Sequence, residues 1–218
     1  VGVYSRAPVD VIGGSFSNQP SVGTGAAIFV GGVSNAPALR GSVSNVFIAD
    51  GVAGVVAGRA SDLRVLRSAF AGITGPAVRV RSNGGVVFAN NTVFGARIGV
   101  LSVSNSGAER ISVRNNIFIG DGIATGRGVS NSTAAVISNS FNLFTNFARY
   151  FAGATPGGGT LTNRDPLINL TTLTISSASS PAVDFGTNYT GAIPFTGIGV
   201  DLGFRESPFS LPTNFFYI

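Results

Sequence analysis

Histidine, cysteine and lysine are all missing from the 218 residues of this chain. Their absence excludes Ser/His and Cys/His nucleophile systems, zinc sites built on histidine or cysteine, and lysine bases. Without cysteine there are no disulfides, so stability has to come from packing. No apolar run reaches the roughly 18 to 20 residues that cross a bilayer, so no membrane span is predicted.

Acidic residues are scarce as well, since the chain has only nine Asp and Glu. Paired carboxylates for glycoside hydrolysis, or an arginine base working with calcium in a pectate-lyase-like elimination, stay chemically open. Asp50, Asp62 and Asp121 stand beside turn glycines or arginines, where capping and ion pairing are ordinary roles. The sequence therefore predicts no catalytic residue, no metal and no cofactor, with a calcium-dependent polysaccharide lyase as the enzymatic alternative.

A repeat is the strongest positive signal in the chain. Five phenylalanines follow one another at a nearly constant interval of about 23 residues, namely Phe47, Phe70, Phe94, Phe118 and Phe141. A unit of this length is too short for two packed helices, and its brief apolar segments fit short strands. We predict an all-β, single-domain, right-handed parallel β-helix, with about seven turns of roughly 22–26 residues between Thr24 and Gly186.

Asparagines recur beside these aromatic positions. Asn tolerates left-handed backbone angles and hydrogen-bonds its own turn, which suits the bends between short strands. We therefore assign a structural role, at the bends and in stacked side-chain ladders, to Asn45, Asn90, Asn91, Asn115, Asn116 and Asn139.

The chain divides into four segments that are expected to share one core. Residues 1–25 form an N-terminal segment or first turn, and residues 26–159 carry the repeats. Residues 160–206 hold the last turns and the terminating motifs, and residues 207–218 form an apolar tail. The chain starts at Val1 and contains no Met, which favours a mature secreted protein whose signal peptide has been removed, with a truncated chain as the alternative.

Three short motifs follow the repeats. In order they are Asp165-Pro166-Leu167, Ser180-Pro181-Ala182-Val183-Asp184-Phe185-Gly186 and Val200-Asp201-Leu202-Gly203. This series resembles the end of bacterial right-handed parallel β-helix proteins of the choice-of-anchor type. The resemblance covers residues 160–206 by motif, and it implies a secreted or surface-exposed β-helix, a fold that enzymes, adhesins and structural proteins share.

The prolines and glycines of these motifs are typical of turns that end strand ladders. Asp165, Asp184 and Asp201 are expected to cap exposed backbone amides there. A calcium site is the competing interpretation, because hard cations need several oxygen ligands. The three aspartates are far apart and no acidic ligand loop is present, so capping is favoured.

All fourteen basic residues are arginines, and the formal net charge of +5 suits an anionic partner. Arg40 and Arg64 are separated by close to one repeat length, and so are Arg59 and Arg81. Each pair is predicted to project from one face, where it either contacts an anionic extracellular polysaccharide or forms a solvated ladder. No recognition motif accompanies the charge, so no nucleic-acid partner is predicted.

The chain ends in an unusually apolar segment, Asn214, Phe215, Phe216, Tyr217 and Ile218. Such a segment either folds back on its own solenoid or adds as a strand to another copy. A head-to-tail contact that does not close repeats into a filament. We predict a non-catalytic extracellular structural protein that self-assembles into a surface fibre, with a polysaccharide-binding or adhesin module as the alternative.

Overall fold

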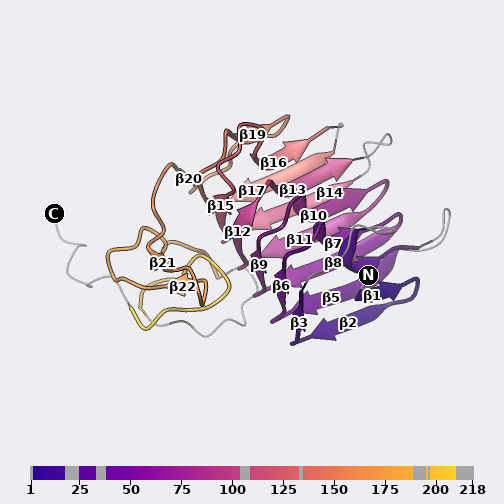
Figure 1. Cartoon of the computed structure of the whole chain (residues 1–218), viewed down its shortest axis with the longest axis horizontal. Helices are drawn as coiled ribbons and strands as arrows, with labels where there is room; N and C mark the ends of the chain where they lie inside the picture. The colour runs from indigo at the N-terminus through magenta and orange to yellow at the C-terminus, as the bar shows by residue number, and fades with distance from the viewer. Residues whose placement is uncertain are drawn as a thin grey trace.

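The computed structural model describes residues 2–17, 25–32, 38–103, 109–132, 135–188, 195 and 197–209. Within these ranges the chain is all-β, and its short strands form three parallel sheets and one small antiparallel sheet (Figure 1). Successive strands pass from sheet to sheet and return to pair in parallel with the strand one turn earlier. The predicted parallel β-solenoid is confirmed.

The three parallel sheets are named here A, B and C. Sheet A consists of β1 (Val3–Ser5), β4 (Ala26–Val30), β7 (Ala53–Ala57), β10 (Pro76–Arg81), β13 (Ile98–Val103), β16 (Arg127–Asn131) and β19 (Arg149–Ala152). Sheet B consists of β2 (Val9–Ile12), β5 (Leu39–Ser44), β8 (Ser61–Leu66), β11 (Gly85–Ala89), β14 (Arg110–Arg114) and β17 (Val136–Ser140). Sheet C consists of β3 (Ser15–Phe16), β6 (Phe47–Ala49), β9 (Ala69–Ala71), β12 (Thr92–Ala96), β15 (Ile117–Gly120), β18 (Leu143–Thr145) and β20 (Leu161–Thr162).

The number of turns differs slightly from the prediction. In the described ranges six turns carry a strand in each sheet, and the last turn has only β19 and β20. The first of the six, β1 to β3, precedes Thr24, which leaves five complete turns in the region where about seven were predicted. The shortfall arises because the chain after β20 leaves the stack.

The phenylalanine repeat does not mark equivalent positions in the turns. Sheet C aligns Phe47 with Ala69, Thr92, Ile117 and Leu143, at spacings that grow from each turn to the next. Phe70 and Phe118 point into the core, whereas Phe47 is 38% exposed and Phe141 precedes its strand. The phenylalanines are nearly evenly spaced, but the turns become longer. Successive phenylalanines therefore occupy different positions in sheet C, some on its inner face and some on its outer face.

A continuous stack of buried rings does fill the solenoid. Neighbouring rings lie 4.7 to 5.8 Å apart between centroids in the series Phe70, Phe88, Phe118 and Phe144. Sheet C supplies all of them except Phe88, which comes from sheet B in the turn where sheet C carries the smaller Val93. The interior of each of these four turns is thus filled by one ring, whichever strand provides it.

Glycines on sheet A make room for three of these rings. A Cβ atom on Gly99 would lie 2.7 Å from the ring of Phe118, and the corresponding contacts are 2.7 Å between Gly54 and Phe70 and 2.6 Å between Gly128 and Phe144. Turns whose ring comes from sheet C therefore need glycine on the facing strand.

The bend between sheets B and C has the same conformation in successive turns. Its first residue has a positive φ of 45 to 55° at Asn45, Arg67, Asn90, Asn115 and Phe141. The next residue points inward, and Asn91, Asn116 and Asn142 form a buried ladder. The backbone N–H of Asn91 donates to Asn116 Oδ1 at 2.9 Å, and the backbone N–H of Asn116 donates to Asn142 Oδ1 at 3.0 Å. The predicted role of asparagine is confirmed for Asn45, Asn90 and Asn115 at the bends and for Asn91 and Asn116 in the ladder. It is wrong for Asn139, which lies inside β17, and Asn142 takes the ladder position in that turn.

After β20 the chain forms a separate layer against the side of the solenoid (Figure 1). We call the described residues 163–188 and 197–209 the C-terminal lobe; it includes the antiparallel pair β21 (Ile168–Asn169) and β22 (Thr174–Ile175). Lobe side chains such as Val183 and Leu202 pack on outward-facing Ile117 and Leu143 of sheet C. The terminating motifs therefore cover a face of the stack and add no further turns.

The glycine that faces a buried ring generates a stability prediction. Gly99→Ala places a methyl group 2.5 Å from the Gly128 carbonyl oxygen and 2.7 Å from Phe118, so we expect a loss of about 1–3 kcal/mol in the free energy of unfolding. Gly158→Ala is the matched control, because a Cβ there meets nothing within 4 Å. Chemical denaturation of both variants checks the difference, and equal stabilities would contradict the described packing.

Candidate anion-binding pocket

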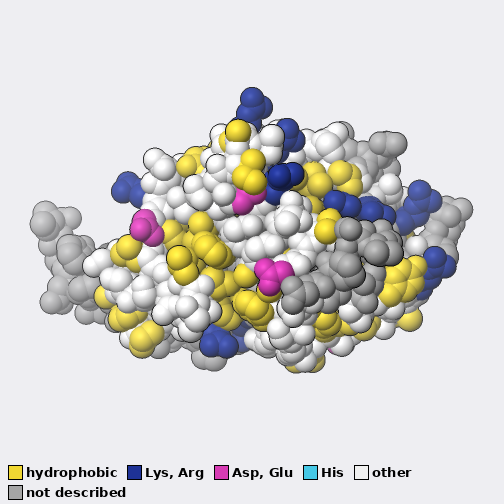
Figure 2. Space-filling view, viewed as in Figure 1, with side chains coloured by type: hydrophobic (Ala, Val, Ile, Leu, Met, Phe, Trp, Pro, Cys, Tyr) yellow, Lys and Arg dark blue, Asp and Glu magenta, His cyan; other side chains and the backbone are white. Residues whose placement is uncertain are grey.

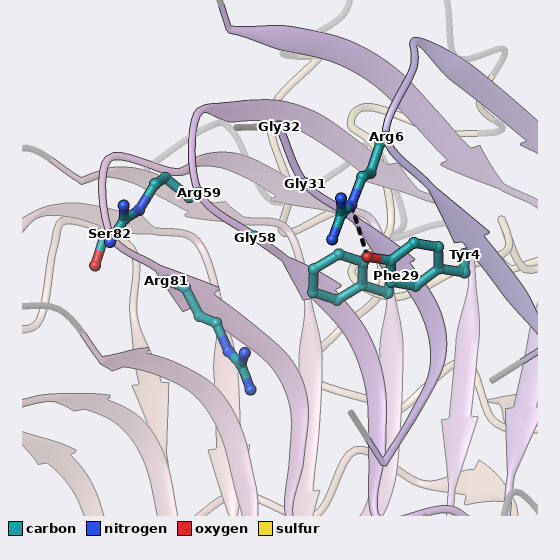
Figure 3. Close-up of a pocket in the computed structure, with 9 residues that line it drawn as sticks. All are labelled: Tyr4, Arg6, Phe29, Gly31, Gly32, Gly58, Arg59, Arg81 and Ser82. Atoms are coloured by element: carbon teal, nitrogen blue, oxygen red, sulfur yellow. Dashed lines mark hydrogen bonds between the residues drawn. The ribbon is translucent and has the colours of Figure 1, made fainter. Parts of the chain in front are cut away.

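A hollow of about 250 Å³ lies on the outer side of the first turns, where sheet A leads into sheet B. We call it the arginine pocket, because three of its lining residues are arginines. The residues that line it are Tyr4, Arg6, Phe29, Gly31, Gly32, Gly58, Arg59, Arg81 and Ser82 (Figure 3).

Two aromatic rings form one wall of the pocket. Tyr4 of β1 pairs with Phe29 of β4, so both side chains leave the outer face of sheet A at the same level. Their rings are stacked, with centroids 4.9 Å apart and an interplanar angle of 7°. Arg6 holds this wall in place, since its Nε donates a 2.9 Å hydrogen bond to the Tyr4 hydroxyl oxygen (Figure 3). The register of two parallel strands thus builds a rigid apolar surface.

Glycine backbone forms the floor of the pocket. A Cβ atom on Gly58 would lie 2.9 Å from both Gly31 Cα and Phe29 Cζ, and a Cβ on Gly31 would lie 3.0 Å from Phe29 Cζ. The Gly58 N–H donates to the Val30 carbonyl at 2.7 Å, which fixes the floor to β4. Any larger residue at these two positions would fill the hollow and displace the ring, so glycine keeps the pocket open.

Positive charge surrounds the pocket without a carboxylate among its lining residues. Arg59 follows β7 and Arg81 ends β10 one turn later, so consecutive turns deliver both guanidinium groups. In the part of the chain that the structure describes, neither forms an ion pair. Nearby Arg79 adds to the field, and burial, followed by the charge of Arg81, lowers the pKa of Arg79. An anionic group fits these unpaired cations.

The two predicted arginine pairs have different positions. Arg59 and Arg81 are brought together in the arginine pocket. Arg40 and Arg64 lie on the exposed face of sheet B, on neighbouring β5 and β8, but two residues out of register, because Arg40 pairs with Asp62 and Arg64 with Ser42. Their spacing along the chain exceeds the local repeat by this offset.

Sequence reasoning missed the first-turn contributors to the pocket. Tyr4 and Arg6 lie in the stretch 1–25, where the alternation of apolar and polar residues in Val9-Asp10-Val11 is the available sequence signal for strands. Phe29 lies in β4 and falls outside the phenylalanine series. The predicted assembly residues Asn214, Phe215, Phe216, Tyr217 and Ile218 lie outside the described residues.

The aspartates of the C-terminal motifs cap backbone amides, as predicted. Asp165 Oδ1 accepts the Leu167 N–H at 2.9 Å, and Asp184 Oδ1 accepts the Gly199 N–H at 3.0 Å. Buried Asp201 accepts the Asp184 N–H at 2.8 Å. Across the described ranges, no group of three or more acidic side chains is placed to hold a metal ion.

Glu206 is the one lobe carboxyl with a clearly displaced pKa. Burial raises its pKa from 4.5 to about 7; a hydrogen bond from the Asp201 amide opposes this shift, and the charges of Asp201 and Asp184 add to it. The Asp201 N–H lies 3.1 Å from Glu206 Oε1. Near neutral pH this side chain therefore carries less negative charge than an exposed carboxylate.

This shift predicts a pH dependence of stability. Because the folded pKa is raised, the neutral form stabilises the fold fully below about pH 4.5, and this stabilisation is lost as the pH rises through about 7. Glu206→Gln stays neutral and keeps the acceptor, so at pH 8 we expect it to exceed the wild type by about 1 kcal/mol after allowing for solvent screening. Denaturation at pH 4 and pH 8 checks this, and a pH-independent difference would rule it out.

No helix among the described residues is long and apolar enough to span a membrane. No protein-family model matches the chain, and neither a curated protein nor a solved structure matches it. The side chains of the arginine pocket are therefore the basis for the functional proposal.

Proposed function

We propose that this chain is a non-catalytic extracellular β-solenoid that binds an acidic polysaccharide through the arginine pocket. The observation that carries the proposal is that Arg6, Arg59 and Arg81 line the same hollow as the stacked rings of Tyr4 and Phe29. Guanidinium groups bind carboxylate or sulfate with charge-assisted hydrogen bonds, and an aromatic wall packs against the apolar side of a sugar ring. An acidic sugar presents both of these surfaces together.

Two features support a binding role without turnover. The pocket lining holds no carboxyl group, so it lacks the paired acid and base that glycoside hydrolysis requires. Arginine side chains stay protonated at physiological pH and serve here as binding cations.

An extracellular setting agrees with the composition and with the motif resemblance. Similarity of the C-terminal motifs to choice-of-anchor-type β-helix proteins implies a secreted or surface-exposed chain. Arginine side chains recur over the solenoid in the view of Figure 2, and acidic side chains are few. A cationic surface of this kind increases the association rate with extracellular polyanions.

The pocket generates a binding prediction. Arg59→Gln combined with Arg81→Gln removes two charge-assisted contacts, so we expect affinity for oligogalacturonate to fall by about 10-fold or more. Isothermal titration at low salt, in the absence of calcium, measures the change. Neutral dextran should not bind the wild type.

The matched control is Arg149→Gln with Arg164→Gln, which makes the same charge change at two exposed arginines outside the pocket. This variant should bind oligogalacturonate like the wild type. An equal loss in both double variants would mean that only net charge matters, and that outcome contradicts a site at the pocket.

Self-assembly into a fibre is the second proposal, and the first turn favours it. Within the described ranges, β1, β2 and β3 each pair on one side only, with β4, β5 and β6. Ile12 at the end of β2 is 73% exposed. Unpaired parallel edges of this kind accept a strand from another copy. The apolar segment 214–218 is the proposed strand.

Removal of residues 214–218 tests this second proposal. Electron microscopy of the intact chain is expected to show filaments, and the shortened chain is expected to stay monomeric with an unchanged circular dichroism spectrum. Filaments that persist after the deletion would exclude this segment as the assembly contact. Dispersed intact chains would leave polysaccharide binding as the function.

A further inference from the structure

A second arginine-lined hollow lies between the solenoid and the C-terminal lobe. It consists of two adjoining hollows of about 430 and 310 Å³, which share Asn45, Arg67, Phe204 and Arg205. We call it the seam groove. Asn45 and Arg67 belong to the bends between sheets B and C, and Phe204 and Arg205 belong to the lobe. The groove therefore exists only because the lobe packs on the side of the stack.

Arg67 lines this groove, and its backbone adopts an unfavourable left-handed conformation. It has a φ of 45° at the bend position where neighbouring turns carry Asn45 and Asn90, with φ of 55° and 53°. Asn adopts this left-handed conformation readily, whereas a longer side chain is strained in it. The Arg67 side chain is exposed, so packing does not explain its presence. The Arg67 guanidinium is therefore available to a ligand in the groove.

The lobe presents its own cation from a fixed backbone. The Gly203 N–H donates to the Asn115 carbonyl at 2.9 Å, and the Phe204 N–H donates to Thr92 Oγ1 at 3.2 Å. The Arg205 guanidinium carbon then lies 5.0 Å from the centroid of the Phe204 ring. Like the arginine pocket, the seam groove combines arginine with an aromatic ring.

One acidic residue, Glu206, lines the seam groove. Its carboxylate accepts the Asp201 N–H, and it faces the Asp201 and Asp184 charges of the lobe. Its raised pKa weakens the opposing negative charge near neutral pH. Within the described residues, neither Arg67 nor Arg205 forms an ion pair. The groove therefore keeps a net attraction for anions.

A single strand connects the two sites. Arg59 precedes β8 at the arginine pocket, and Arg67 follows β8 at the seam groove. Between them Arg64 is exposed on the outer face of the same strand. Eight residues of extended chain cover at most about 26 Å. Asp62 is the acidic residue on this strand, and it lies beside Arg40 of β5.

We propose that the seam groove is a second anion-binding site, and that one acidic polysaccharide chain runs from the arginine pocket across β8 to this groove. This inference rests on the proposed function, because it extends the binding path of the same acidic polysaccharide. It assigns Arg64 to the middle of the path and Arg67 and Arg205 to its far end. A polymer that contacts both ends gains affinity through effective concentration.

The test compares a short and a long ligand. Trigalacturonate is shorter than the path, so calorimetry of the wild type should show two trimers bound per chain. Polygalacturonate that reaches both sites should bind on the order of 100-fold more tightly than the trimer. Arg67→Asn with Arg205→Gln should bind one trimer and lose most of this gain. Arg67→Asn places at the bend the residue that neighbouring bends carry, so the fold is preserved.

Each outcome separates the two proposals. The control Arg149→Gln with Arg164→Gln should keep both trimers and the full gain with polymer. Unchanged polymer binding by Arg67→Asn with Arg205→Gln would overturn the seam groove as a binding site. The arginine pocket is tested separately, by the affinity of Arg59→Gln with Arg81→Gln. Two bound trimers without tighter binding of polymer would overturn the path across β8. If Arg67→Asn with Arg205→Gln loses all trimer binding, while Arg59→Gln with Arg81→Gln keeps it, the arginine pocket is not a binding site.

Discussion

The left-handed bend between sheets B and C sets the register on which the whole molecule depends. Each bend places one residue at positive φ and turns the next residue inward, where buried amides of Asn91, Asn116 and Asn142 bond from turn to turn. Because side chains alternate along a strand, a slip of one residue would exchange the inner and outer faces of every sheet. The ring stack inside and the Tyr4 and Phe29 wall outside both follow from this alignment.

The sequence was sufficient for the fold class, because a repeat of about 23 residues with short apolar segments admits few architectures. It also identified the asparagine bends and the aspartate caps, since both depend on local backbone chemistry. It misplaced the phenylalanines, because the turns lengthen along the stack and Phe88 enters the ring series from another sheet. Gly99, which faces Phe118, marks a turn whose buried ring comes from sheet C. This relation can be recognised only when the pairing of the two facing sheets is known.

The candidate sites were only partly predictable for a related reason. Spacing brought Arg59 and Arg81 together, since both stand at the same corner of consecutive turns. The same reasoning failed for Arg40 and Arg64. Their separation exceeds the local repeat by two residues, so the two side chains lie at different levels along the paired strands. The seam groove depends on Phe204 and Arg205, which reach Arg67 through tertiary packing of the lobe. A linear repeat contains no information about such a contact.

The first turn gives the arginine pocket a property that the rest of the stack lacks. None of the described residues 2–17 is fully buried, whereas the lobe is hydrogen-bonded to Thr92 and Asn115 in later turns. In a one-dimensional stack the least buried turn opens at a free energy below that of global unfolding. Tyr4 and Arg6 belong to this turn, so the pocket is complete only while the turn is docked. In the proposed site, a sugar that contacts both Arg6 and Arg59 would stabilise the docked turn, so that binding and local opening are thermodynamically linked.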